Sequence, residues 1–103
     1  MKRKVLLAMA FSLLLVVSAF GETMRANIKT GTAAYVSPQI LMEVVKAAAE
    51  GNFAPALQAT AVSASINIPY NTEVEIIDRE EVIVELRVKG KVGSYYTLIG
   101  WLR

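Results

Sequence analysis

Carboxylates are the only side chains in this sequence from which a catalytic acid–base pair could be built. The chain contains no histidine and no cysteine. This excludes Ser-His-Asp and Cys-His catalysis, and it excludes zinc sites made of imidazole or thiolate ligands. Two carboxylates can act together in glycoside hydrolysis, and the candidates are Glu73, Glu75, Glu80, Glu81 and Glu85. All fall on predicted turns or on the solvent side of predicted strands, so we interpret them as a solvated charged surface and expect no enzyme activity.

The same carboxylates offer oxygen ligands to a cation. Asp78 lies close to Glu80 and Glu81 in the sequence, and Ca²⁺ takes oxygen ligands. Their spacing matches no calcium-binding loop, and the isolated glycines do not form a phosphate-binding loop. We therefore expect neither a metal nor another cofactor.

Four aromatic residues near the predicted ends of strands are the candidate ligand-binding residues: Tyr70, Tyr95, Tyr96 and Trp101. Tyrosine and tryptophan are enriched at interfaces because they combine apolar area with a polar tip. Tyr95 and Tyr96 are adjacent, so in a strand they point to opposite faces and we expect one of them outside. The simpler interpretation places one of these tyrosines in the core, with Trp101 closing it beside Val88 and Leu98.

The first 21 residues have the order of a secretory signal peptide. A basic head at 1–4 is followed by an apolar run at 5–17 and by small residues before Glu22. A membrane-spanning helix needs about 20 apolar residues, which exceeds this run. We predict cleavage of residues 1–21, with a cut after Ala19 or an uncleaved anchor as alternatives. The protein would be periplasmic or secreted, touching the membrane only through the signal peptide before cleavage.

Removing the signal peptide changes the charge of the protein. The whole chain carries eleven basic and nine acidic side chains, a net charge of +2. Three of the basic residues lie in the signal peptide, so eight remain against nine acidic ones and the net charge becomes −1. This balance does not favour nucleic-acid binding. Residues 22–103 are enough for one domain, and without cysteine that domain has no disulfides, which favours a partner or a homo-oligomer.

Two helices are predicted within residues 37–60. Ser37 can cap the first free N–H groups, and the proline after it fits the first helical turn. Apolar residues then recur at helical spacing until Gly51, which suits a left-handed helix end. A shorter second helix follows, with Phe53 and Leu57 expected to face the core.

Apolar and polar residues alternate with a period of two in the second half of the chain. The pattern predicts strands at 61–68, 73–77, 82–89 and 95–99, with a weaker first strand at 24–36 that bends at Gly31. Short, alternating, consecutive strands are typical of an antiparallel meander with one solvent-facing side.

The polar segment 78–81 is predicted to be the turn of a hairpin. Core residues must face core residues across the two strands. The register that satisfies this pairs Val74 with Leu86, Ile76 with Val84, Glu73 with Arg87 and Glu75 with Glu85.

Residues 70–102 resemble the second half of a bacterial SH3-like domain. The resemblance lies in a polar turn leading into the strand at 71–77, a charged turn, a strand ending in Leu86-Arg87-Val88, a glycine turn and the closing Gly100-Trp101-Leu102. It implies a small antiparallel barrel whose early strand is 26–36. The helical segment 37–60 is then an insertion, and the stretch 90–99 is longer than usual. We expect a mainly β fold, α+β by content, with an OB-like barrel as the alternative.

The resemblance also implies a function, because such domains in exported bacterial proteins often bind cell-wall peptides or other proteins. We therefore predict a non-enzymatic exported binding or accessory domain whose partner is a protein or a cell-wall peptide. The alternative is a structural subunit of an envelope or secreted assembly, which the apolar stripe of the first helix and the missing disulfides favour.

Overall fold

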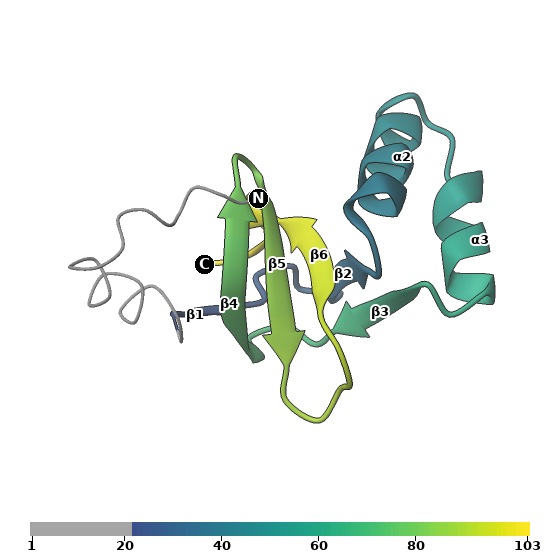
Figure 1. Ribbon diagram of the computed structural model, residues 1–103. Helices are drawn as coiled ribbons and strands as arrows, with labels where there is room; N and C mark the ends of the chain where they lie inside the picture. The colour runs from purple at the N-terminus through teal and green to yellow at the C-terminus, as the bar shows by residue number, and fades with distance from the viewer. Residues whose placement is uncertain (1–21) are drawn as a thin grey trace, which may run out of the picture.

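The computed structural model describes residues 22–103, so the predicted signal peptide lies outside the described residues. In chain order the elements are β1 (Thr23–Arg25), β2 (Thr32–Tyr35), α2 (Pro38–Ala49), α3 (Ala54–Ala61), β3 (Ser65–Ile68), β4 (Glu73–Glu80), β5 (Ile83–Val88), β6 (Tyr95–Leu98) and the 3-10 helix η1 (Ile99–Trp101). The strands form one antiparallel sheet in the order β1-β4-β5-β6-β2-β3, which does not close into a barrel (Figure 1). The expectation of a mainly β, α+β protein is confirmed.

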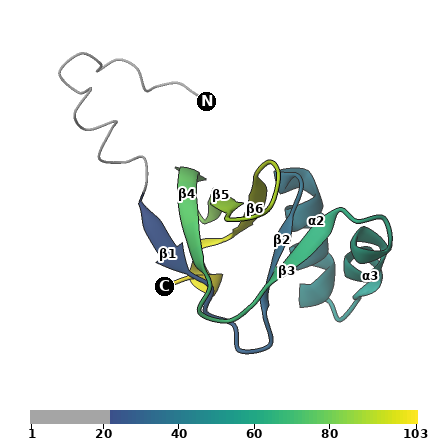
Figure 2. The same ribbon diagram turned by 90° about the horizontal axis from the view of Figure 1, so that it is seen from below.

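Apolar side chains form two clusters, one on each face of the sheet. The inner core consists of Ala26, Ala34, Ile68, Val74, Ile76, Val84, Leu86, Val88 and Leu102. The sheet curls around the inner core, so that β1 lies on one side of this core and β2 on the other (Figure 2). The helix-side core consists of Tyr35, Leu41, Val44 and Ala59. The period-two pattern of β5 thus sends alternate residues to the inner core, as the sequence predicts.

The first helix begins and ends where its capping residues predict. The Ser37 hydroxyl accepts a hydrogen bond from the N–H of Ile40 at 3.2 Å, and a proline follows it in the first turn. After the last helical turn Gly51 takes a φ of +81°, which glycine adopts without a steric penalty.

The second helix turns its larger side chains away from the core, which contradicts the prediction. Phe53 is 60% exposed and Leu57 is 71% exposed, whereas Ala59 is buried. Leu57 and Ala59 are two positions apart, about 200° around a helix, so both cannot face the same neighbour. α3 packs on the helix-side core through its alanines, and its large side chains face solvent.

The predicted first strand is two strands in the structure. β1 pairs with β4, whereas β2 lies between β6 and β3. The chain turns between them and Gly31 has a φ of +109°. The predicted strand 61–68 is also shorter, because α3 continues to Ala61 and Ser63 adopts a left-handed φ of +61° before β3 begins.

The β4–β5 hairpin has a register two positions away from the predicted one. Val74 pairs with Val88 and Glu75 with Arg87, and a bulge follows Ile76. The polar residues 78–80 belong to the strand, and the chain turns at Glu81, whose φ is +56°. A shift of two positions leaves every side chain on the same face, so the alternation pattern does not distinguish the two registers.

The last residues of the chain pair with β1 on the side away from β4. The backbones of Arg25 and Arg103 exchange two hydrogen bonds of 2.8 and 2.9 Å, and Leu102 forms a bridge with Ala26. The outer edge of β1 is thereby covered at Arg25. Among residues 22–103, β3 is the sheet edge without a neighbouring strand.

Candidate functional site

The four aromatic residues predicted to bind a ligand do not form one surface. Tyr95 packs against the inner core. Tyr96 and Trp101 pack against the helix-side core, on the other face of the sheet. Tyr70 lies in the turn between β3 and β4 and is 40% exposed. Both side chains are partly buried, Tyr95 against the inner core and Tyr96 beneath the helices, so neither is the fully exposed tyrosine that the sequence predicts.

Trp101 does not occupy the core position predicted for it. It is half-buried and packs on the helix-side core together with Leu98. Leu102 is the residue that enters the inner core with Val88, and it is 5% exposed. The 3-10 turn at 99–101 rotates the chain, so that Trp101 and Leu102 face different clusters.

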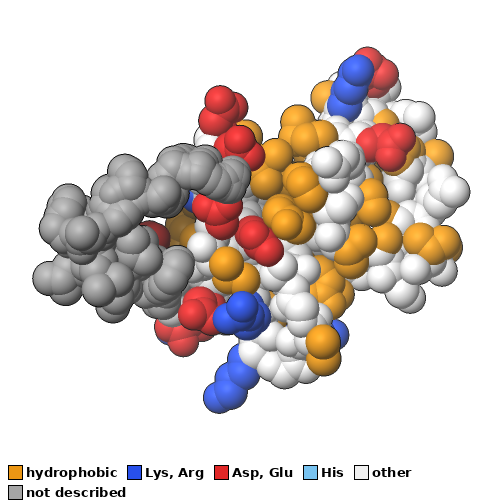
Figure 3. Space-filling model, in the orientation of Figure 1, with side chains coloured by type: hydrophobic (Ala, Val, Ile, Leu, Met, Phe, Trp, Pro, Cys, Tyr) orange, Lys and Arg blue, Asp and Glu red, His pale blue; other side chains and the backbone are white. Residues whose placement is uncertain are grey.

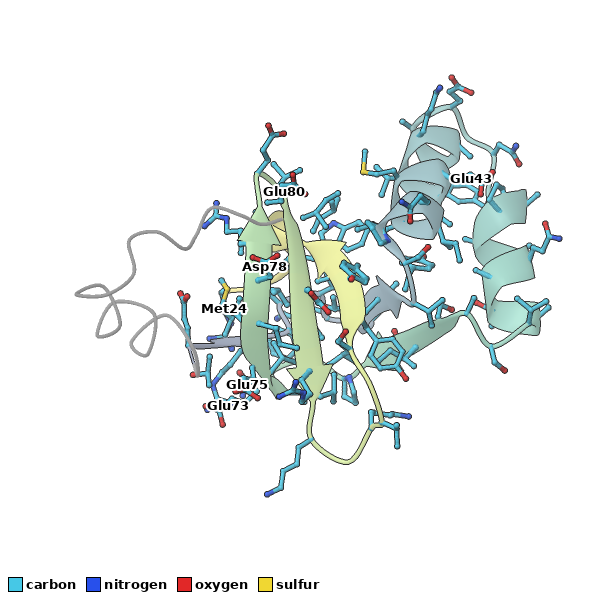
Figure 4. The ribbon with its side chains drawn as sticks, in the orientation of Figure 1. Met24, Glu43, Glu73, Glu75, Asp78 and Glu80 are labelled. Carbon is cyan, nitrogen blue, oxygen red and sulfur yellow. The ribbon has the colours of Figure 1, made fainter. Side chains whose placement is uncertain are left out.

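The acidic residues are spread along β4 and β5 and do not converge on one point. Figure 4 shows Glu73 and Glu75 at one end of β4 and Glu80 at the other. Glu75 lies 3.4 Å from the Arg87 guanidinium, and Glu85 accepts a hydrogen bond from the Ser94 hydroxyl at 2.5 Å. In the part of the chain that the structure describes, no group of three or more acidic residues is placed to hold a metal ion.

Tyr96 lines a small groove of about 60 Å³ together with the carboxylates of Asp78, Glu80 and Glu85. Burial raises the pKa of the Tyr96 phenol, and the negative charges of Glu85 and Asp78 raise it further. The phenol therefore stays protonated at neutral pH. It can donate a hydrogen bond there, but it cannot act as a base.

The most distinctive surface lies around Tyr70. The Lys29 ammonium is 5.4 Å from the centre of the Tyr70 ring, and the Arg103 guanidinium carbon is 5.6 Å from it. Both distances fall within the range of cation–π attraction. We call this the Tyr70 surface, and it comprises Arg25, Asn27, Lys29, Tyr70, Asn71 and Arg103.

Two asparagines hold the arginines of this surface in place. The Arg103 Nε donates to the side-chain oxygen of Asn27 at 3.1 Å, and its Nη2 donates to the side-chain oxygen of Asn71. The Arg25 Nη1 donates to the backbone oxygen of Asn71 at 2.9 Å. Asn71 takes a left-handed φ of +71°, which asparagine tolerates better than most residues. The loop geometry thus fixes the direction of both guanidinium groups.

Among residues 22–103, no carboxylate forms an ion pair with Arg25, Lys29 or Arg103. Between residues 22 and 103 the structure contains one ion pair, Arg87 with Glu75, and it lies outside this surface. Arg25, Lys29 and Arg103 instead contact amide oxygens and an aromatic ring. Arg25 has Glu73 opposite it on β4, whereas Lys29 and Arg103 beside Tyr70 carry two positive charges that create a local positive potential.

The cations of this surface were not found from the sequence, whereas Tyr70 was. Lys29, Tyr70 and Arg103 are far apart in the chain, and no short motif links them. The fold brings them together because the turn before β2, the turn after β3 and the C-terminal residues meet at one end of the sheet.

Two larger hollows lie elsewhere. One, of about 340 Å³, runs beside β4 and β5 and is lined by residues of both charges, including Glu73, Arg87 and Lys91. The other, of about 250 Å³, lies between α2 and α3 and is mostly apolar.

Within the described residues, neither helix has the length and apolar character that a membrane crossing requires. Comparison of the chain with protein-family models, with curated proteins and with solved structures gives no significant match.

Proposed function

We propose that this protein is an exported, non-enzymatic binding domain that holds an acidic group of a protein or peptide partner on the Tyr70 surface. The observation that carries the proposal is the Tyr70 ring with Lys29 and Arg103 beside it, neither of which forms an ion pair with a carboxylate of the described residues. The proposal of export rests on the order of basic, apolar and small residues at positions 1–21.

The Tyr70 surface has the properties of a recognition site for a carboxylate. A guanidinium group presents several N–H donors in a fixed plane that suits carboxylate oxygens. Arg103 donates hydrogen bonds from Nε and Nη2 to the two asparagines, which leaves its Nη1 donors available to a ligand. The tyrosine adds apolar contact area at a small cost in side-chain entropy.

We propose that the open sheet is an SH3-like fold whose barrel is incompletely closed, with an OB-like fold as the alternative. The pairing of Leu102 with Ala26 supports it, because this pairing draws the end of the chain across the inner core towards β1. The closing segment Gly100-Trp101-Leu102, on which the resemblance rests, is the part of the chain that makes this pairing. α2 and α3 replace the short loop that is usual in the family, so this segment departs from the resemblance.

A capture experiment with matched variants tests the proposed function. Wild-type protein and the variants Tyr70→Ala, Lys29→Gln and Lys91→Gln are immobilised and exposed to envelope extract, after circular dichroism has shown that each is folded. Lys91 is an exposed lysine on the β5–β6 loop, outside the Tyr70 surface. It therefore controls for the loss of one positive charge.

We expect a partner that is captured by wild type and by Lys91→Gln but lost with Tyr70→Ala and weakened with Lys29→Gln. Its capture should also decrease as salt rises, because exposed charges are screened. Capture that survives both changes in the Tyr70 surface would contradict the proposal. Equal loss with Lys91→Gln would show a nonspecific charge effect and would also contradict it.

A further inference from the structure

We propose that β3 pairs with β3 of a second copy of this chain, forming a two-fold symmetric dimer with a continuous antiparallel sheet. This inference concerns a different surface from the Tyr70 surface and goes beyond the proposed function. It begins with the position of β3, which is the last strand in the order β1-β4-β5-β6-β2-β3. At the opposite end of the sheet, Arg103 already pairs with β1.

The register of β3 on β2 determines which of its backbone groups are unpaired. Ile66 pairs with Ala34, and the Val36 N–H donates to the Ala64 oxygen at 3.0 Å. In an antiparallel ladder the hydrogen-bonded pairs alternate, so Ala64, Ile66 and Ile68 direct their backbone groups to β2. The N–H and C=O groups of Ser65 and Asn67 point outward, away from the sheet.

β3 is short and Pro69 follows it directly, but the strand itself carries no charge and no bulge that would block strand pairing. Natural edge strands carry lysine, proline or a bulge that blocks another strand. β3 is Ser-Ile-Asn-Ile, with regular pairing to β2, and no charged residue occurs anywhere from Gly51 to Thr72. The neighbouring α3 exposes Leu57, and its C-cap residue Val62 is 67% exposed. Hydrophobic side chains gather over the helices at this end of the molecule (Figure 3).

Charge is the reason for choosing a second copy as the occupant. A two-fold axis sets the same edge against itself, so an edge that carries charges of one sign would repel its copy. The uncharged segment 51–72 meets this requirement, which a complex with an unrelated partner would not impose. A dimer would also enlarge the sheet of a small domain that has no disulfide.

The symmetry also fits the unpaired groups. With the axis at Ile66, Ser65 of one copy faces Asn67 of the second copy, and Asn67 faces Ser65 of the second copy. Each of these pairs exchanges two backbone hydrogen bonds, because all the groups involved point outward. Ile66, which is half-buried against the inner core, meets Ile66 of the second copy as a non-hydrogen-bonded pair, where side chains lie closest.

Sedimentation equilibrium of the exported protein, purified from periplasm or medium, tests the dimer over a range of concentrations. The variants are Asn67→Pro, Asn67→Lys and, as a control, Val92→Lys at a loop site that is 94% exposed. Proline at 67 removes only an outward N–H and leaves the bonds between β2 and β3 intact. Asn67→Lys provides a second variant if the proline variant does not fold. In parallel, amide hydrogen exchange is followed by NMR.

We expect wild type and Val92→Lys to dimerise with similar affinity, and both Asn67 variants to be folded monomers at the same concentrations. The amides of Ser65 and Asn67 should exchange slowly in the dimer and rapidly in the monomeric variants. A wild-type protein that stays monomeric at every concentration would overturn the proposal, as would a dimer that persists in folded Asn67→Lys. Protection of these amides only when envelope extract is added would also overturn it and indicate a foreign strand.

Discussion

The hydroxyl of Thr97 donates a hydrogen bond to the backbone oxygen of Ala33 at 2.7 Å, and this bond satisfies the polar group of a fully buried residue. Ala33 lies on β2 and Thr97 on β6, two strands that pair through their backbones only at Tyr35 and Tyr96. A side chain therefore supplies the link between these strands where the regular ladder stops. The packing of the helices depends on this junction, since Tyr35 and Tyr96 both contact the helix-side core.

Replacing Thr97 by valine should destabilise the protein without changing its shape. The variant keeps the side-chain volume but removes the hydroxyl donor of the partly buried Ala33 oxygen, which costs about 1–3 kcal/mol. Thr32→Val is the matched control. The Thr32 hydroxyl lies 3.3 Å from the Trp101 oxygen, which also accepts the Asn27 N–H at 2.9 Å and so keeps a partner. Urea denaturation should show a larger loss for Thr97→Val than for Thr32→Val; equal losses would contradict this assignment.

Gly31→Ala should be more harmful than Gly90→Ala. Both glycines have positive φ angles, +109° and +89°, so both variants suffer backbone strain of about 1–3 kcal/mol. A β-carbon at position 31 would also collide with the Asn67 side chain, whereas one at position 90 meets nothing within 4 Å. Thermal denaturation of the two variants isolates the cost of the collision. Equal melting temperatures would show that the Asn67 side chain moves aside freely.

Leu102→Ala should cost more stability than Trp101→Ala. Leu102 is enclosed in the inner core, so its truncation leaves a cavity and costs about 2–5 kcal/mol. Trp101 is half-buried, so water can fill the space that its truncation leaves. The comparison is made by urea denaturation followed by far-ultraviolet circular dichroism, which does not depend on the tryptophan. Near-complete unfolding of Trp101→Ala with a milder effect of Leu102→Ala would restore the closing role that the sequence suggests for Trp101.

Stability should decrease as the pH rises above 10. Burial raises the pKa of Tyr35 above its ordinary value of 10.0, and burial together with Glu85 raises that of Tyr96. Below the ordinary value both phenols are protonated in the folded and unfolded states, and their contribution does not change with pH. Above it the unfolded chain loses these protons first, which favours unfolding until the folded-state pKa values are passed. Urea midpoints at about pH 8 and about pH 11 should differ less in Tyr35→Phe than in wild type. An equal difference would contradict the role of Tyr35.

The sequence predicts local structure in this protein better than it predicts neighbours. Ser37 and Gly51 delimit the first helix because capping depends on a few adjacent residues. The faces of β5 follow from alternation for the same reason. The β4–β5 register was wrong because a two-residue shift preserves every face.

Prediction of the candidate site was incomplete for a related reason. Tyr70 could be chosen from its residue type and its place after a strand. The cations beside it come from the turn before β2 and from the C-terminal residues, and only the topology assembles them. Trp101 was placed in the wrong cluster because alternation ends where η1 begins.

The pairing of Arg25 with Arg103 also determines how early during synthesis the domain can complete its folding. The two strand segments come from opposite ends of the described chain, and the neighbouring contact of Asn27 with Arg103 spans 76 positions. Contacts of such long sequence separation form late and slow folding. A chain that is still emerging lacks the residues that cover β1, and the inner core lacks Leu102. The chain should therefore remain unfolded until residues 102 and 103 have been made, and under the proposal of export this delay would keep it in a form that a translocation channel can accept.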